Sequence, residues 1–378
     1  MELLEGATTV ERMLLDQAKR TRTPANGSIE LLPLCNMNCD MCYVRLSKKE
    51  MEAKGRLRTA DEWLEVGRQM KDAGVLFLLL TGGEPFLYPD FRRLYLELRK
   101  MGMIITINTN GTLIDEDLAE FFGKYKPRRV NITLYGADED AYTNLCHYPG
   151  GYEKTLQGIR LLRENDVDVK VSSSLAQSNK SDLDRLLDIG ETLGIPVWVD
   201  TYMMPATRER DLPYNMQVRL EPEEAAREGI RAMKRVLGPE LFPQYVRQSV
   251  ERADHPEPAE AKPGHMSCMA GQCSFTINWQ GEMRPCVILT EPAISVFEVG
   301  FEAAWKYIVE ETHKILLNEK CSTCHMRHLC RTCAASALLE TGSYDGVPDY
   351  MCRYAGESLR ILREEWEKIQ HGQTISDR

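Results

Sequence analysis

Apolar and polar positions follow two different periods along residues 28–205. Short, nearly continuous apolar runs such as 75–80, with glycines close by on either side, are typical of strands buried in a parallel sheet. Between them lie segments whose apolar residues recur every three or four positions, one of which begins at the capping-box pair Thr59 and Glu62. The pattern predicts strands at 28–34, 75–80, 103–108, 129–135, 167–174 and 195–201, separated by helices from 59, from 91 to about 102, and at 115–122, 152–164 and 181–193.

Six strands that alternate with helices predict an α/β fold with a parallel sheet. Both an open, doubly wound sheet and an incomplete barrel fit this periodicity. In parallel barrels the working residues lie at the carboxyl ends of the strands. The search for chemistry therefore concentrates on the residues that follow each predicted strand.

The flanking segments have other patterns. Residues 7–20 predict an amphipathic helix with Val10, Met13 and Leu14 on one side, which we expect to pack against the body of the protein. Residues 206–252 are charged and mostly helical in pattern, 253–264 has the Pro- and Glu-rich composition of a linker or mobile loop, and 357–370 predicts a final helix. We expect four parts: an extension at 1–27, the α/β core at 28–205, a helical linker and loop at 206–264, and a cysteine-rich domain at 265–378.

The composition of the chain excludes several classes of function. A chain of 378 residues with 43% hydrophobic residues supports a sizeable core, and a net charge of −10 argues against a nucleic-acid binder. No run approaches the roughly 18 apolar residues of a membrane helix, and the N-terminus lacks the pattern of a secretory signal. We therefore expect a cytoplasmic protein without a nucleic-acid or membrane partner.

The chain has twelve cysteines, distributed very unevenly. Three lie within residues 35–42, eight lie between Cys268 and Cys352, and Cys146 stands apart. Because the cytosol keeps thiols reduced, metal binding or catalysis is expected rather than disulfides. Cys146 precedes His147, but no third group orients this pair as a nucleophile and base, so we interpret Cys146 as an unligated residue.

The first cysteine group follows the first predicted strand. Cys35, Cys39 and Cys42 have C-x3-C-x2-C spacing, and Tyr43 comes directly after the last. A four-iron cluster normally takes four cysteine ligands, so three thiolates would leave one iron with an open position for chemistry. The spacing alone fits a zinc loop or three incidental thiols as well.

This loop resembles the signature of the radical S-adenosylmethionine (radical SAM) enzymes. The resemblance implies an incomplete (β/α)6 barrel and a [4Fe–4S] cluster whose fourth iron is chelated by S-adenosylmethionine (SAM). An electron from the cluster would cleave SAM to methionine and a 5′-deoxyadenosyl radical, which abstracts hydrogen from the substrate.

Motifs after later strands extend this resemblance. Thr81-Gly82-Gly83-Glu84-Pro85 could be an ordinary turn, but after a three-cysteine loop it is similar to the stretch that binds the SAM amino group. In the fourth strand Thr133 keeps the expected hydroxyl, while Tyr135 replaces the usual aspartate. The cofactor contacts implied by the resemblance are Tyr43, Gly82, Gly83, Glu84, Asn108, Asn110, Thr133, Ser173 and Tyr202.

The second cysteine group has paired spacings, for which two zinc sites with four thiolates each are a physical alternative. Its pattern resembles the SPASM extension, which holds two auxiliary [4Fe–4S] clusters; the two residues between Cys330 and Cys333 depart from the usual three. By resemblance, one cluster is held by Cys268, Cys273, Cys286 and Cys333, and the other by Cys321, Cys324, Cys330 and Cys352. Three [4Fe–4S] clusters and SAM are thus the expected cofactors, with electron transfer or a structural role for the auxiliary pair.

The expected function is modification of a peptide or protein side chain to a crosslink, a thioether or an oxidised residue, with a flavodoxin- or ferredoxin-type reductant. No catalytic base is identified. Val287 stands where anaerobic sulfatase-maturing enzymes carry an aspartate that serves as a base, which argues against that activity. The residues also fit a SPASM dehydrogenase that acts on a small molecule, or a structural zinc protein. Residues 1–27 are too few for a leader-recognition domain, so we expect such a domain to be missing or supplied by a separate leader-binding protein.

Overall fold

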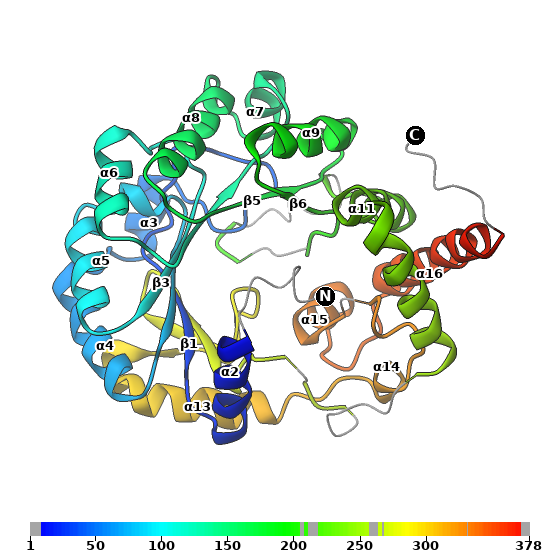
Figure 1. Ribbon diagram of the computed structural model, residues 1–378. Helices are drawn as coiled ribbons and strands as arrows, with labels where there is room; N and C mark the ends of the chain where they lie inside the picture. The colour runs from blue at the N-terminus through cyan, green and yellow to red at the C-terminus, as the bar shows by residue number, and fades with distance from the viewer. Residues whose placement is uncertain are drawn as a thin grey trace.

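The computed structural model describes residues 9–204, 208–210, 218–256, 264–266, 268–330 and 332–371. One sheet has the strand order β6-β5-β4-β3-β2-β1-β7-β8-β9, and β1 to β6 are parallel, as the sequence predicts. The sheet curves into a partial barrel with helices on its outer side (Figure 1). The strands are β1 (Asn26–Glu30), β2 (Phe77–Thr81), β3 (Ile104–Thr109), β4 (Arg129–Thr133), β5 (Val169–Ser174), β6 (Val197–Asp200), β7 (Ser274–Ile277), β8 (Glu282–Arg284) and β9 (Ile294–Ser295).

The helices include all those that the periodicity predicts, and the described residues contain six others: α3, α7, α12, α13, α14 and α15. The first two of these have N-terminal caps: Ser47 forms a capping box with Glu50, and the Asp138 side chain accepts a bond from the Ala141 N–H. The helices are α2 (Thr9–Thr21), α3 (Lys48–Lys54), α4 (Ala60–Asp72), α5 (Phe91–Lys100), α6 (Glu116–Lys124), α7 (Glu139–Leu145), α8 (Gly151–Glu164), α9 (Leu183–Leu193), α11 (Pro222–Asp254), α12 (Val296–Val299), α13 (Phe301–His313), α14 (Glu319–Ser322), α15 (Ala334–Thr341) and α16 (Asp349–Gln370).

The cysteine-rich segment contributes three strands that the sequence pattern did not predict. Strand β7 pairs in parallel with β1, and β8 and β9 continue the sheet in antiparallel order. The ladder between β1 and β7 begins where the Asn26 N–H donates to the Cys273 carbonyl at 3.0 Å. The boundary expected at 264/265 therefore separates two stretches of sequence but not two sheets.

The start of β2 differs from the prediction for a local reason. The apolar run begins at Val75, but its N–H donates to the Met70 carbonyl and closes the end of α4. The N–H groups of Leu76 and Phe77 both donate to the Ala25 carbonyl, and the strand begins at Phe77. An apolar run indicates that a stretch of chain lies inside the protein. It does not indicate at which residue the backbone begins to pair with a neighbouring strand.

The two faces of the parallel sheet differ in polarity. The register aligns Ile29, Leu80, Ile107 and Val130, all fully buried, on the face that packs against the helices. The alternating positions point to the other face, because successive side chains of a strand alternate. This inner face carries polar side chains, which include Glu30, Asn108, Asn131, Thr133, Ser172 and Ser174.

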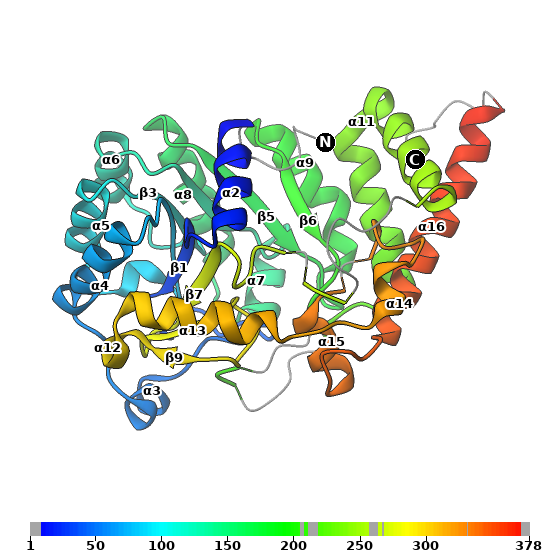
Figure 2. The ribbon, with the colours of Figure 1, turned by 90° about the horizontal axis from the view of Figure 1, so that it is seen from below.

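Helix α2 forms and packs against the protein as predicted, but not through the side that carries Val10, Met13 and Leu14. Val10, Met13 and Leu14 are 64%, 67% and 46% exposed. The opposite side of the helix faces the protein: Ala18 is buried with Ala25 and Cys273, and Leu15 packs against them. Figure 2 shows α2 at one end of the barrel.

Helices α11 and α16 lie side by side along one flank of the barrel (Figures 1 and 2). Helix α11 is interrupted at Gly238, whose φ is 64°, and α16 begins at Asp349, earlier than predicted. Of the linker or loop expected at 253–264, residues 253 and 254 end α11, whereas 257–263 lie outside the described residues. None of the helices in the described ranges combines the length and apolar character needed to cross a bilayer.

This burial pattern predicts very different costs for two apolar truncations. Leu80→Ala should lower the free energy of unfolding by about 2–5 kcal/mol, because it leaves a cavity between the sheet and the helices. Met13→Ala should change it by less than about 0.5 kcal/mol, because that side chain is largely solvated. Urea unfolding of the reconstituted variants, followed by circular dichroism, measures both. Equal costs would contradict the described placement of α2.

Candidate active site

The loop with the first three cysteines begins at the carboxyl end of β1 and is held by its neighbour β2. The Gly83 N–H donates to the Leu32 carbonyl at 2.7 Å, and the Glu84 N–H donates to the Leu34 carbonyl at 2.9 Å. After the cysteines, the Leu46 N–H donates to the Pro33 carbonyl at 2.9 Å. Backbone bonds therefore fix both ends of the loop.

The three thiols lie close together and are substantially buried. Burial raises the pKa of Cys35 to about 12, and the thiols of Cys39 and Cys42 also raise it. Burial raises the pKa of Cys42 as well. Two backbone N–H groups point at sulfur: Met37 donates to Cys35 Sγ at 3.4 Å and Arg45 donates to Cys42 Sγ at 3.3 Å.

This donor set fits an iron–sulfur cluster. Iron binds thiolates, and N–H donors aimed at the sulfurs stabilise their negative charge. In the described part of the chain, no three His, Cys, Asp or Glu side chains are placed to hold one metal ion. A cubane makes a different demand, since each of its cysteine ligands binds a different iron.

Gly82 and Gly83 are required by the close approach of β1. A Cβ on Gly82, which has φ 145°, would lie 2.5 Å from the Leu32 carbonyl oxygen. A Cβ on Gly83 would lie 2.2 Å from the Leu34 carbonyl oxygen. Any side chain at either position would therefore push the cysteine loop away from β2.

Glu84 is buried and engaged within the protein. Its carboxylate accepts bonds from the Thr109 hydroxyl, at 2.8 and 2.9 Å, and from the Asn110 N–H at 2.9 Å. Burial raises its pKa to about 7, although these bonds oppose the rise. Through these contacts Glu84 ties β2 to β3 beside the cysteine loop, and its role in binding SAM stays a prediction.

Of the two predicted asparagines, Asn110 contacts the cysteine loop and Asn108 contacts Asn131. Asn110 Nδ2 donates to Asn36 Oδ1 at 2.9 Å and lies 3.7 Å from Cys35 Sγ. Asn108 Oδ1 accepts from Asn131 Nδ2 at 2.8 Å on the inner face. The Oδ1 of Asn131 is buried without a hydrogen-bond partner. Asn131 thus offers an acceptor that the sequence analysis did not single out.

The remaining predicted cofactor contacts have different environments. Thr133 and Ser172 are paired on the inner face, whereas Ser173 alternates to the face that it shares with Val171. Tyr202 packs with its ring centroid 5.6 Å from that of Tyr350, and its hydroxyl is buried without a partner. Ser173 is therefore turned away from the other predicted polar contacts.

The segment 208–210, which we call the strap, crosses the cysteine loop and was not predicted. The Glu209 N–H donates to the Tyr43 carbonyl at 3.1 Å. Arg210 Nη1 donates to the carbonyls of Cys39 and Cys42 at 3.0 and 3.2 Å. In the sequence the strap lies in a charged stretch that is equally typical of a solvated surface.

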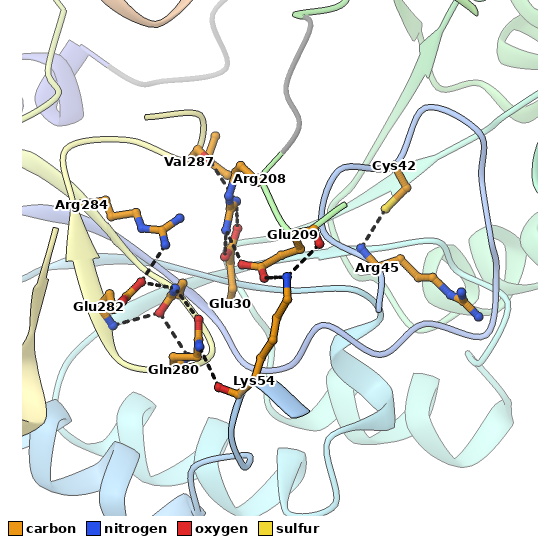
Figure 3. Close-up of polar contacts among 11 residues, drawn as sticks. Glu30, Cys42, Arg45, Lys54, Arg208, Glu209, Gln280, Glu282, Arg284 and Val287 are labelled. Carbon is orange, nitrogen blue, oxygen red and sulfur yellow. Dashed lines mark hydrogen bonds and ion pairs between the residues drawn. The ribbon is translucent and has the colours of Figure 1, made fainter. Parts of the chain in front are cut away.

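Arg208, the first residue of the strap, forms a buried ion pair with Glu30 of β1. Its two terminal nitrogens donate to the two carboxylate oxygens at 2.6 Å, and both side chains are 1% exposed. Burial opposes the charge of Arg208, but Glu30 outweighs it and raises the guanidinium pKa. Nη1 also donates to the Val287 carbonyl at 2.9 Å (Figure 3), so Arg208 links β1 to the residue after Cys286.

The end of α7 supports the loop from another side. The N–H groups of Asn38 and Asp40 donate to the carbonyls of Cys146 and Leu145 at 2.9 and 3.0 Å. His147 Nε2 lies 2.6 Å from Asp40 Oδ1. Cys146 is fully buried beside Cys39, whose pKa is raised first by the hydrogen-bonded Cys146 thiol and then by burial. Cys146, which we interpreted as an unligated residue, thus contacts a predicted ligand.

The eight C-terminal cysteines fall into two neighbourhoods. Burial raises the pKa of Cys352, as it does for Cys286, and nearby thiols raise each further. The thiols that act on Cys352 are Cys330, Cys321 and Cys324, and those that act on Cys286 are Cys333 and Cys268, with Cys273 next to Cys268. The thiols of each neighbourhood belong to one of the two sets expected from the sequence, and their assignment to two clusters stays a prediction. A cavity of about 250 Å³ is lined by Cys268, Cys321, Cys324, Cys330, Cys333 and Cys352.

Two solved structures share this architecture. Streptococcus suis SuiB bound to precursor peptide SuiA superposes with a TM-score of 0.66 at 18% identity, covering 91% of this chain and 80% of SuiB. Native anSMEcpe with bound AdoMet also has a TM-score of 0.66 at 18% identity, covering 92% of this chain and 99% of the other. The likeness includes the C-terminal part, so the expected partial barrel with a SPASM-type extension is confirmed as a fold.

Sequence relatives cover most of the chain. The AdoMet-dependent heme synthase of Methanosarcina barkeri (strain Fusaro / DSM 804) is 25% identical over 340 residues, which are 86% of this chain and 95% of the synthase. The subtilosin biosynthesis protein AlbA of Bacillus subtilis (strain 168) is 26% identical over 270 residues, which are 70% of this chain and 55% of AlbA. Residues 29–188, which contain the cysteine loop and strands β2 to β5, match the Radical SAM superfamily model. The chain therefore contains a region, residues 29–188, that matches the radical SAM superfamily.

Proposed function

We propose that this enzyme holds a [4Fe–4S] cluster on Cys35, Cys39 and Cys42, binds SAM beside it, and modifies a peptide or protein side chain by radical chemistry. The product would be a crosslink, a thioether or an oxidised residue. The observation that carries the proposal is the group of three buried thiols at the end of β1, two of which accept backbone N–H bonds. Bound cluster and SAM would supply the 5′-deoxyadenosyl radical.

The residues around the loop would hold SAM in place. The backbone of Gly82 and Gly83 passes next to the loop, and its carbonyls would accept hydrogen bonds from the amino group of SAM. Glu84 keeps the ends of β2 and β3 together. Asn131 offers an unpartnered acceptor to the ribose or the amino group. Further contacts are proposed for Tyr43, Asn108, Asn110, Thr133 and Tyr202, with Ser172 or Ser174 in place of Ser173 because of their inner-face position.

The C-terminal cysteines would hold two auxiliary [4Fe–4S] clusters. We assign one to Cys268, Cys273, Cys286 and Cys333, and the other to Cys321, Cys324, Cys330 and Cys352, which the two thiol neighbourhoods support. With all irons ligated, these clusters would carry electrons rather than bind substrate. A flavodoxin- or ferredoxin-type protein of the cytoplasm would supply the reducing electron, and a separate protein would recognise any peptide leader.

A small-molecule substrate is the second candidate. It is favoured by the heme synthase relatives, which match this chain over more of their length than AlbA does. Anaerobic incubation with SAM, reductant and the product of a neighbouring short reading frame separates the two candidates. A peptide mass that falls by two hydrogens supports the first, and an unchanged peptide together with turnover of a small molecule supports the second.

The proposed clusters predict the metal content of the protein. Anaerobically reconstituted protein should contain about 12 irons per chain, as three cubanes require. Replacing Cys35, Cys39 and Cys42 together by alanine should remove about 4 of them and abolish formation of 5′-deoxyadenosine with dithionite. Iron analysis and chromatography measure the two effects. Colourless protein that contains zinc, or a triple variant that still cleaves SAM, would refute the proposed site.

A further prediction concerns the close backbone contact between Gly83 and Leu34. Gly83→Ala should displace the cysteine loop, because the new Cβ would meet the Leu34 carbonyl. We expect loss of the three-cysteine cluster signal in electron paramagnetic resonance (EPR), with the auxiliary signals retained. Gly356→Ala is the matched control, since a Cβ there meets nothing within 4 Å. An intact cluster signal in Gly83→Ala would show that the loop does not depend on this contact.

A further inference from the structure

Arg284 is a buried arginine whose donors are incompletely used. The residue is 8% exposed, and its Nη2 donates to Glu282 at 2.6 Å. Its Nε and Nη1 are buried and have no hydrogen-bond partner. A buried donor without a partner costs about 1–3 kcal/mol, and more on a charged group. Such a cost is expected where a bound group supplies the missing acceptor.

The sheet register places Arg284 on the inner face. Arg284 of β8 is paired with Thr276 of β7, and the Thr276 hydroxyl is bonded to the Ser28 hydroxyl of β1 at 2.8 Å. Glu30 lies two residues beyond Ser28 and therefore on the same face. Figure 3 shows the guanidinium of Arg284 extending towards Arg208 and Glu30.

Arg208 presents a further unused donor in the same region. Its terminal nitrogens are occupied by Glu30 and the Val287 carbonyl, but its Nε is buried without a partner. Val287 contributes an apolar side chain here and so offers no carboxylate to either arginine. Glu282 and Glu30 each occupy only part of one guanidinium.

We propose that Arg284 and Arg208 bind a carboxylate of the substrate. A guanidinium is always charged, and its planar set of N–H groups matches carboxylate oxygens better than any other side chain does. The inference rests on the proposed function and adds to it a substrate class: a molecule with a free carboxylate near the reacting group. The carboxylate belongs either to an acidic residue of a peptide or to an acid side chain of a small molecule.

The position suits a substrate anchor. The guanidinium carbon of Arg208 lies 5.6 Å from the centre of the Tyr43 ring, and Tyr43 follows the last cysteine of the loop. Arg284 precedes Cys286, a proposed auxiliary ligand, by two residues. A carboxylate held between the two arginines therefore sits between the loop that would generate the radical and the cysteines that would accept an electron.

Equilibrium dialysis with two matched pairs of probes tests this proposal. One pair is a blocked pentapeptide, Ala-Ala-Glu-Ala-Ala, and the same peptide with Gln; the other is coproporphyrin III and its tetramethyl ester. The proteins are wild type, Arg284→Gln and the control Arg160→Gln, which changes an exposed arginine of α8. Because loss of Arg208 would leave Glu30 buried and unpaired, Arg208→Lys is the second variant.

We expect wild type and the control to bind the free acid of one pair at least 10-fold more tightly than its blocked form. Arg284→Gln should lose that preference, Arg208→Lys should weaken it, and the pair that shows it identifies the source of the carboxylate. Equal binding of acid and blocked form by wild type in both pairs, or an undiminished preference in Arg284→Gln, overturns the proposal. An altered auxiliary-cluster EPR signal in Arg284→Gln with unchanged binding overturns it too.

Formation of 5′-deoxyadenosine without substrate is measured on the same proteins. Its absence from wild type would refute the proposed function while leaving the dialysis result valid. We expect the control Arg160→Gln to retain it, because Arg160 is an exposed residue of α8.

Discussion

The site depends on one close contact between two stretches of backbone. Residues 32–34, which lead into the cysteine loop, lie against Gly82 and Gly83 so closely that no Cβ fits between them. The two backbone bonds across this contact fix where the loop leaves the sheet. Because Glu84 then binds the end of β3, one turn aligns three strand ends. The glycines thus matter first as spacers, and the proposed exposure of their backbone groups to SAM would follow from that.

The loop itself has little regular structure, and segments distant in sequence hold it. Arg210 of the strap binds two of its carbonyls, and the end of α7 accepts two of its N–H groups. Thiolates on a flexible loop would have to be ordered when the cluster binds, at an entropic cost for each residue. Anchoring the backbone beforehand reduces that cost. It also explains why a short helix such as α7 ends where it does, with its last carbonyls directed at the loop.

The sequence was sufficient for the parts of the fold that local chemistry decides. Strands β1 to β6 and their helices follow from apolar periodicity and caps, and the cysteine spacings identified both groups of thiols. Contacts between distant segments left no such signal. Strand β7 is too short to stand out, and it forms because β1 offers an unpaired edge. Arg208 looks like any charged surface residue until the fold buries it against Glu30. For α2 the periodicity showed that the helix has an apolar and a polar side. It did not show which side packs against the protein, and the apolar side is exposed.

The continuity of the sheet has a consequence for the chemistry. Radical abstraction needs the substrate within contact of SAM, and removal of the surplus electron needs an acceptor close by. A hinge between core and extension would let these two distances vary independently. Here β7 is hydrogen-bonded to β1, the strand that carries the cysteine loop, and Arg208 bridges β1 to the residue after Cys286. The loop and the proposed auxiliary ligands are therefore attached to the same strand, with Cys273 bonded at its amino end and the residue after Cys286 linked through Arg208 to Glu30 at its carboxyl end. A substrate anchored on the inner face, as proposed, would meet both in a fixed relation. Specificity then has to come from what lines that face, which is why its unused polar atoms are more informative about the substrate than the overall fold.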